Sequence, residues 1–224
     1  AWFDVWGQRH STVDYKRPAE QLDWMLGQGV SVSMYMFHGG TNFWYMNGAN
    51  TAGGYRPQPT SYDYDAPLGE WGNCYPKYYA FREVIQKHLP HGTVLPELPA
   101  DNPTTTFATI ELKESAPLQA AFHQTTESEN VLSMEDLGVD FGYIHYQTTI
   151  NKAGKQKLII QDLRDYAVIL VDGKQVASLD RRYNQNNVML DIQKAPATLE
   201  ILVENTGRVN YGPDILFNRK GITN

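Results

Sequence analysis

The part of the chain that decides its fold is residues 34–72, which read MYMFHGGTNFWYMNGANTAGGYRPQPTSYDYDAPLGEWG. The stretch begins as an apolar run, breaks at Gly39-Gly40, and continues as a loop crowded with Tyr, Trp, Asn and Asp. Exposed rings gain nothing from facing water, so a loop that combines rings with short polar side chains favours ligand binding. Rings offer a stacking surface, and Asn, Asp and Tyr offer directional hydrogen bonds. This mixture suits a sugar, which has an apolar C–H face and a rim of hydroxyl groups.

The run in front of the loop, residues 30–37, reads VSVSMYMF and alternates without placing a charge on either face. Such a pattern predicts a parallel strand that is buried on both sides. Tyr35 lies near the carboxyl end of this predicted strand, on the face that it shares with Ser31 and Ser33. In parallel α/β architectures functional sites gather at that end, so Tyr35 is a candidate site residue.

Length and composition exclude several classes of protein. With 224 residues the chain can form one large domain or two ordinary ones. Its net charge of −6 gives no basic field for a nucleic acid, and no apolar run approaches the ~20 residues of a membrane span. Cys74 is the single cysteine, so no internal disulfide can form, and the compartment stays open. Because the chain starts with AWFDVWG, we expect its natural beginning to lie upstream.

The sequence pattern changes near residue 91, from predicted helices and a strand to a series of short β-type runs. Helices are predicted from Pro18 to Gly27 and from Pro76 to Leu89, which gives the first segment, residues 1–91, an α/β character. A proline-rich linker at 92–105 follows. Residues 106–224 hold short β-type runs, and Asp172-Gly173 predicts a hairpin. The runs span 107–112, 142–150, 156–161, 166–179, 186–192 and 198–205. They predict an all-β sandwich or jelly roll.

The residues that metal binding or nucleophilic catalysis would need are missing from the sequence. Asp63, Asp65 and Glu70 could suggest a cation site, but the oxygen ligands and the glycine of a calcium loop are missing, so we expect them to hold turns. The six histidines show no metal-ligand spacing, and no G-x-S-x-G motif is present. Cys74 has no evident base partner. The sequence therefore predicts neither a metal nor a cofactor.

Two long motifs carry a family resemblance: MYMFHGGTNFWYMNGAN at 34–50 and PTSYDYDAPLGEWGN at 59–73. With WFDVWGQRHS, KYYAFREVIQKHL and LVENTGRVNYGP elsewhere, the chain resembles the β-galactosidases of glycoside hydrolase family 35 over nearly its whole length. The resemblance implies a (β/α)8 TIM barrel followed by a β-sandwich of the jelly-roll, galactose-binding-like kind. Residues 1–91 would be the C-terminal quarter of that barrel, since a whole barrel takes about 250 residues. Residues 106–224 would be an incomplete first sandwich domain.

The resemblance also implies which residues form the site. Both catalytic glutamates are expected upstream of Ala1, so this chain would carry no catalytic residue and would be inactive alone. Substrate binding is assigned to Tyr35, Tyr62, Tyr64 and Trp2, although Trp2 could equally pack at the barrel end. In an extended segment Tyr62 and Tyr64 would share one side.

The expected activity is that of a retaining glycoside hydrolase that removes terminal β-D-galactosyl residues. The alternatives are a non-catalytic carbohydrate-binding protein and an exo-β-glucosaminidase of the same family. The expected partners are a β-galactoside and the missing N-terminal barrel portion, and a homo-oligomer stays open. No nucleic acid and no membrane span are expected. By resemblance alone, the location would be secreted, periplasmic or lysosomal.

Overall fold

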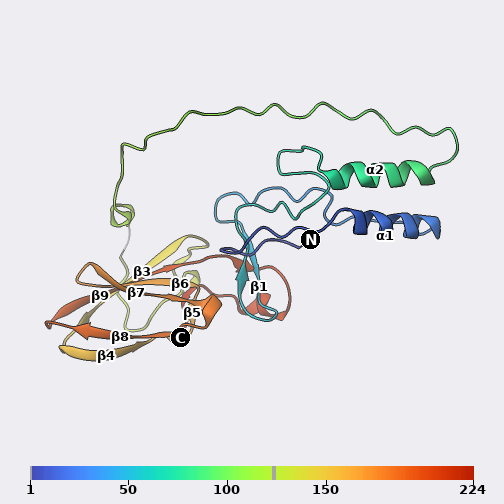
Figure 1. Cartoon of the computed structure of the whole chain (residues 1–224). Coiled ribbons are helices and arrows are strands. Elements are labelled where there is room, and N and C mark those ends of the chain that lie inside the picture. The colour runs from blue at the N-terminus through green and yellow to red at the C-terminus, as the bar shows by residue number, and fades with distance from the viewer. Residues whose placement is uncertain (1, 123–124) are drawn as a thin grey trace. The chain divides into compact units, whose positions relative to one another are not determined.

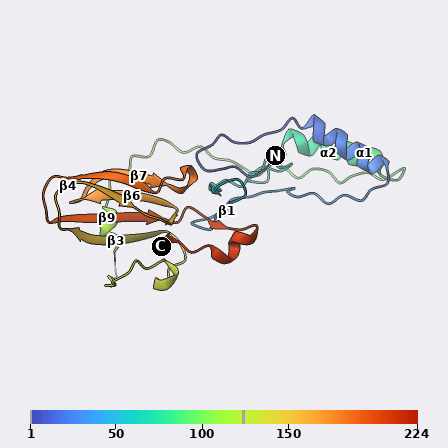
Figure 2. The same ribbon diagram turned by 90° about the horizontal axis from the view of Figure 1, so that it is seen from below.

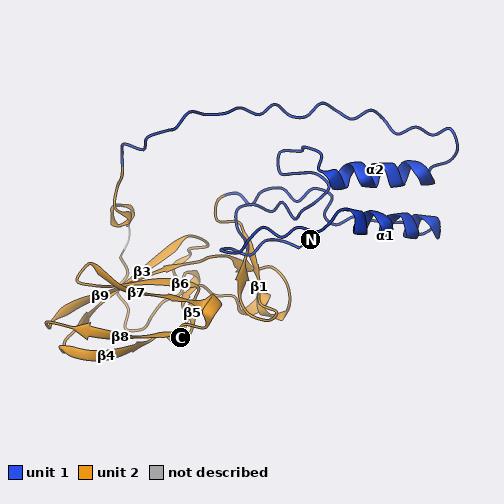
Figure 3. Cartoon of the chain, in the orientation of Figure 1, with its two compact units in different colours: residues 1–43, 58–114 blue, residues 44–57, 115–224 orange. Residues whose placement is uncertain are grey.

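The computed structural model describes residues 2–122 and 125–224. It divides into two compact units (Figure 3). Unit 1 consists of residues 1–43 and 58–114, and unit 2 consists of residues 44–57 and 115–224. The middle of the aromatic loop leaves the first unit and joins the second.

Unit 1 contains the two predicted helices. Helix α1 spans Lys16–Gly27 and helix α2 spans Pro76–His88, and the two pack side by side (Figures 1 and 2). Proline in the first turn suits each helix start, where the missing N–H would have no partner in any case. Asp23 of α1 accepts hydrogen bonds from Lys87 (2.7 Å) and His88 (2.5 Å) of α2. Neither helix, nor any other among the described residues, is long and apolar enough to cross a membrane.

Two predicted strands are wrong. Residues 30–37 form no strand and turn at Tyr35, and Val30 and Val32 are exposed rather than buried. Residues 107–112 are also irregular, and Phe107 and Leu112 are exposed. A strand exists only through backbone hydrogen bonds to a neighbour, and among residues 2–122 and 125–224 no strand lies beside either segment. The described part of unit 1 therefore shows two helices and loops, and the barrel itself is not seen.

Buried carboxylates hold the loops of unit 1. Asp4 accepts from the backbone N–H of Ser11 (2.7 Å), and its other oxygen lies 2.6 Å from Nδ1 of His10. Asp63 accepts from the Tyr75 hydroxyl (3.0 Å), and its other oxygen lies 3.4 Å from Nε2 of His10. A buried carboxylate must find donors for its oxygens, so each of these aspartates fixes the chain around it.

Asp65 links three segments of unit 1. Its carboxylate pairs with the buried ammonium of Lys77 on α2 (2.7 Å) and accepts from the backbone N–H of Val13 (2.9 Å). The loop, the second helix and the N-terminal segment are therefore joined at one side chain.

Unit 2 is an antiparallel sandwich. One sheet has the order β3-β9-β6-β7 and a second consists of β4 and β8 (Figure 1). These strands span Tyr143–Ile150, Ala197–Glu204, Tyr166–Val171, Lys174–Asp180, Gly154–Ile159 and Asn187–Ile192, in the order just given. They confirm the β-runs predicted between residues 142 and 205. Apolar side chains of both sheets, among them Ile169, Val203 and Ile192, meet in one buried core.

The predicted hairpin is confirmed in detail. Asp172 and Gly173 connect β6 to β7 with φ values of 48° and 74°. A two-residue turn with positive φ at both positions matches the twist of antiparallel strands, which is why Asp-Gly predicts it. The Asp172 carboxylate also accepts from the backbone N–H of Thr198 on β9 (2.8 Å).

Short elements complete unit 2. Strand β5, Leu163–Arg164, pairs with β11, Gly221–Ile222. Strands β1 (Gly48–Asn50) and β2 (Arg56–Pro57) form a sheet with β10 (Arg208–Val209), in the order β10-β1-β2. Single 3₁₀ turns span Leu118–Ala121, Glu135–Leu137, Arg181–Tyr183 and Pro213–Phe217. The aromatic loop thus supplies two strands to the β-unit.

The core of unit 2 gives a first testable prediction. Ile169 is 0% exposed, whereas Ile159, the same residue type on β4, is 55% exposed. Ile169→Ala should lower the free energy of unfolding by about 2–5 kcal/mol, and Ile159→Ala by about 1 kcal/mol or less. Urea unfolding followed by circular dichroism measures both variants. Equal losses for the two would contradict the core described here.

The Asp4–His10 pair gives a second prediction, on pH. The hydrogen bond that the His10 ring donates to Asp4 raises the pKa of His10 above 6.5, and the charges of Asp4 and Asp63 add to the effect. A pKa that is higher in the folded state means that the pair stabilises the fold below pH 6.5. This stabilisation is lost as the pH rises through the folded-state pKa of His10. An NMR titration of the His10 ring should give a value above 6.5, and Asp4→Asn should bring it back toward 6.5. A wild-type value at or below 6.5 would refute the pair.

Candidate functional site

The four predicted site residues meet in one cluster of rings in unit 1, with Tyr64 at its centre. Ring centroids lie 5.9 Å from Trp2 to Tyr64, 6.0 Å from Tyr35 to Tyr64, and 5.4 Å from Tyr62 to Tyr64. The Tyr35 ring stands at 88° to that of Tyr64, an edge-to-face contact. Aromatic pairs prefer such tilted geometries at these distances, so the four rings support one another.

The ring cluster has a buried side and an open side. Tyr64 is 6% exposed and packs with Phe3 and Ala66, whereas Tyr35 is 77% exposed and Trp2 60%. Phe3 lies behind the cluster, with its ring 6.3 Å from that of Tyr62. Phe3 is not predicted as a site residue, because nothing in its sequence position distinguishes it from an ordinary packed ring. The arrangement gives unit 1 an aromatic wall that is anchored from behind.

A glycine explains how Tyr62 reaches this wall. A Cβ atom at Gly39 would overlap the backbone carbonyl of Tyr62, so only glycine permits the approach. The Tyr62 backbone N–H then donates to the Gly40 carbonyl (3.0 Å), and Thr41 forms a bridge with Ser61. The Gly39-Gly40 break in the sequence is therefore the place where two distant parts of the loop meet.

The segment that carries Tyr62 and Tyr64 is not extended, which corrects the prediction. Tyr64 and Asp65 have φ values of 65° and 49°, so the chain turns there. The Asp63 carboxylate accepts from the backbone N–H of Asp65 (3.0 Å), a local bond that an extended chain cannot make. Residues other than glycine adopt positive φ only when their surroundings hold them there. Tyr62 and Tyr64 still face one cluster, because the turn brings their rings together.

The hydroxyls of Tyr62 and Tyr64 remain protonated at neutral pH. Burial raises the pKa of Tyr62, and its hydrogen bond with the Tyr35 hydroxyl raises it further. Burial also raises the pKa of Tyr64, with a smaller contribution from Tyr35. Within the described residues the Tyr64 hydroxyl has no hydrogen-bond partner. These hydroxyls can donate to and accept from a polar ligand, but they do not act as acids or bases near pH 7.

The carboxylate of Glu70, the last one near the cluster, is already hydrogen-bonded to other side chains of unit 1. Glu70 accepts from the hydroxyls of Thr41 (2.7 Å) and Ser61 (2.9 Å) and so closes the base of the loop. Asp63, Asp65 and Glu70 thus hold turns. No group of three His, Cys, Asp or Glu side chains suited to a metal ion occurs in the described part of the chain, outside which His123 lies.

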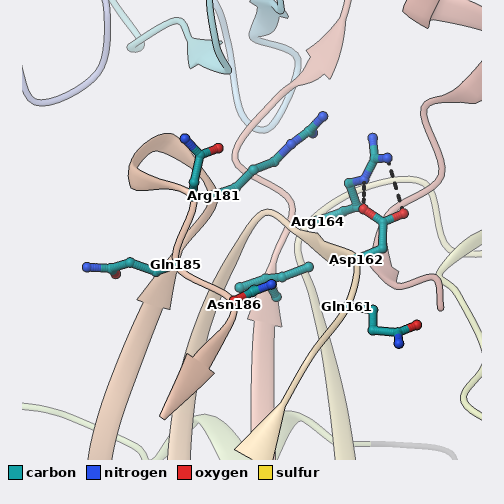
Figure 4. Close-up of a pocket in the computed structure, with 8 residues that line it drawn as sticks. Gln161, Asp162, Arg164, Arg181, Gln185 and Asn186 are labelled. Carbon is teal, nitrogen blue, oxygen red and sulfur yellow. Dashed lines mark hydrogen bonds and ion pairs between the residues drawn. The ribbon is translucent and has the colours of Figure 1, made fainter.

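Unit 2 has a polar cavity of about 290 Å³ (Figure 4). Its lining comes from Gln161–Arg164, Arg181 and Asn184–Asn186. Arg164 is paired with Asp162 (2.6 Å), and Gln161 and Gln185 point away from each other in Figure 4. Side chains that diverge and charges that are already paired do not make a binding site, so the ring cluster of unit 1 is the better candidate.

Comparison with known families assigns both parts of the chain. Residues 1–88 match the model of glycosyl hydrolases family 35. Residues 131–224 match the model of the beta-galactosidase first all-beta domain. The ring cluster falls within the first match and the sandwich within the second.

Comparison with individual proteins agrees. The chain is 42% identical over 225 residues to a beta-galactosidase of Xanthomonas manihotis, a match that covers 99% of this chain and 37% of that protein. It is 43% identical over 226 residues to a beta-galactosidase of Mus musculus, covering 94% and 33%. The chain thus spans about a third of the length of these relatives. A solved GH2 beta-galacturonidase of Eisenbergiella tayi aligns with 26% identity over 45% of this chain and 20% of its own, at a TM-score of 0.32.

Long motifs, two family models and relatives near 40% identity thus agree from one end of the chain to the other. Residues 1–88 therefore match glycosyl hydrolases family 35, and residues 131–224 match the first all-beta domain of the beta-galactosidases.

Proposed function

We propose that this chain forms part of a retaining β-galactosidase and that Trp2, Tyr35, Tyr62 and Tyr64 make one wall of its galactose pocket. The observation that carries the proposal is their convergence on Tyr64, from three separate segments of the chain. The relatives that bear the name beta-galactosidase support it. An aromatic wall with neutral hydroxyls fits a sugar, because rings pack on its C–H face and hydroxyls bond its rim.

The catalytic carboxylates belong, in this proposal, to sequence that precedes Ala1. Retaining glycosidases need two carboxyl groups about 5–5.5 Å apart, one as acid/base and one as nucleophile. Asp4, Asp63, Asp65 and Glu70 are bound to backbone or side-chain donors of their own unit. None of them is free to take either role, so the 224-residue chain should bind sugar without cleaving it.

The same proposal covers the architecture. Unit 1 would be the end of a (β/α)8 barrel, and unit 2 a jelly-roll domain of the galactose-binding-like kind. A non-catalytic carbohydrate-binding protein and an exo-β-glucosaminidase are the alternatives. Both are tested by assaying the longer protein, which carries the residues before Ala1, on aryl β-galactosides and β-glucosaminides.

Tyr64 provides the test of the pocket wall. In the longer protein, Tyr64→Phe removes a hydroxyl that lacks a partner within the described chain and keeps the ring. A lost hydrogen bond to a sugar hydroxyl should lower kcat/KM for a β-galactoside about 10- to 100-fold, at little cost in Tm. The measurement is steady-state kinetics beside thermal unfolding.

The matched control is Tyr79→Phe, which removes the hydroxyl of an exposed tyrosine on α2. It should leave both quantities unchanged. If Tyr64→Phe lowered Tm while the folded enzyme kept its normal kcat/KM, Tyr64 would be a packing residue and the proposed wall would lose its centre.

A further inference from the structure

Tyr55 occupies a buried polar socket in unit 2, far along the sequence from its partners. Its hydroxyl lies 2.6 Å from the Gly207 carbonyl, 2.9 Å from the Asp165 carboxylate and 3.0 Å from the Thr206 hydroxyl. A phenol has one proton to donate and can accept as well, so these three groups can use its full bonding capacity. Burial raises the pKa of Tyr55, which keeps the proton in place.

The socket is built around a buried ion pair. Lys220 is 0% exposed, and its ammonium donates to Asp165 (2.6 Å) and to the Gly207 carbonyl (2.7 Å). Asp165 also pairs with Arg181 (2.8 Å), whose guanidinium lies 4.3 Å from the centre of the Tyr55 ring. Burial lowers the pKa of Lys220 to about 8, although Asp165 opposes the shift. Buried charges persist only when every partner is in place, so this socket depends on Tyr55.

Tyr55 sits near the tip of a long hairpin. At the tip, within unit 2, Ala49 pairs with Pro57 and Asn50 with Arg56, and β1 also pairs with β10. Ala49 is completely buried there. The tip is therefore not a free loop, because it contributes strands and a buried tyrosine to the β-unit.

The base of the same hairpin belongs to unit 1 and carries a ring of the cluster. The Asn42 backbone N–H donates to the Thr60 carbonyl (2.7 Å), and its side-chain amide donates to the Pro59 carbonyl (3.0 Å). Tyr62 follows directly and bonds Gly40. The pairing that aligns Tyr62 with the rest of the wall is thus continuous in sequence with the segment that ends in the socket.

We propose that Tyr55 is a positioning residue: its socket fixes the tip of the hairpin, and the hairpin transmits this restraint to Tyr62 and Tyr64. A loop that is held at both ends has fewer conformations to lose when a ligand binds. The role assigned to the cluster as a sugar-binding wall rests on the proposed function, whereas the mechanical coupling does not.

Hydrogen–deuterium exchange on the whole 224-residue chain tests the coupling without any sugar. Tyr55→Phe keeps the ring and removes the hydroxyl from its partners, which are Asp165, Thr206, Gly207 and Lys220. Amides of residues 44–57 and the hydrogen-bonded amides of Asn42 and Tyr62 should exchange about 10-fold faster. Amides of β9 should keep their protection, which shows that the sandwich is still folded. The matched control is Tyr45→Phe in the same segment, which should change none of them.

A milder variant guards against unfolding. Thr206→Val removes one partner of the Tyr55 hydroxyl and should give a smaller acceleration of exchange at the same amides. If Tyr55→Phe also removes the protection of β9, Thr206→Val takes its place as the test of the coupling. Faster exchange confined to residues 44–57, with Asn42 and Tyr62 unchanged, would overturn the proposal. Because no sugar is present, this result is independent of the kinetics of Tyr64→Phe, and either claim can fail alone.

Discussion

The ion pair between Asp65 and Lys77 is the interaction on which the geometry of unit 1 depends. The Asp65 carboxylate neutralises the buried ammonium of Lys77 and accepts from the backbone of Val13. Removing one partner of a buried ion pair leaves an uncompensated charge, which is among the most costly changes that a fold can suffer. The backbone at Tyr64 and Asp65 lies in the left-handed region, and this ion pair is part of what holds it there. The position of the Tyr64 ring therefore follows from a charge pair as well as from its packing on Phe3 and Ala66.

In unit 2, too, a buried aspartate holds irregular segments of the chain in place. Its sandwich has an apolar core, in which β-branched and leucine side chains of two sheets interlock. The irregular connections around that core are held instead by Asp165, which binds Lys220 and Arg181 together. In both units an aspartate that lies outside the regular elements fixes the segments that a ring must reach. Directional bonds suit this task, since a loop has too little apolar surface to order itself.

Local signals made much of the fold predictable. Both helices, the Asp172-Gly173 hairpin and the strands between residues 142 and 205 were correctly predicted, because proline, turn residues and alternation act over a few positions. Residues 30–37 and 107–112 were not, because a strand needs a partner that its own sequence does not contain.

The residues of the candidate site also divide into those that could be predicted from the sequence and those that could not. Tyr35 was a candidate from its place in the predicted strand, whereas Trp2, Tyr62 and Tyr64 came from the resemblance. No spacing rule would place Trp2 on Tyr64 across 62 positions of sequence. The positive φ at Tyr64 could not be foreseen, because tyrosine has no preference for it. Tyr55, Asp165 and Lys220 were missed altogether. Their partners are 55–165 positions apart, and a lysine among polar residues resembles a solvated one until the fold encloses it.

Saturation-transfer NMR tests most directly our proposal that the ring cluster is a surface for the C–H face of galactose. In the longer protein, irradiation of aromatic protons should transfer saturation to the ring protons of bound galactose. Trp2→Ala, which removes the exposed ring at the edge of the wall, should weaken that transfer. Transfer that is absent, or that is the same with and without the Trp2 ring, would contradict the account.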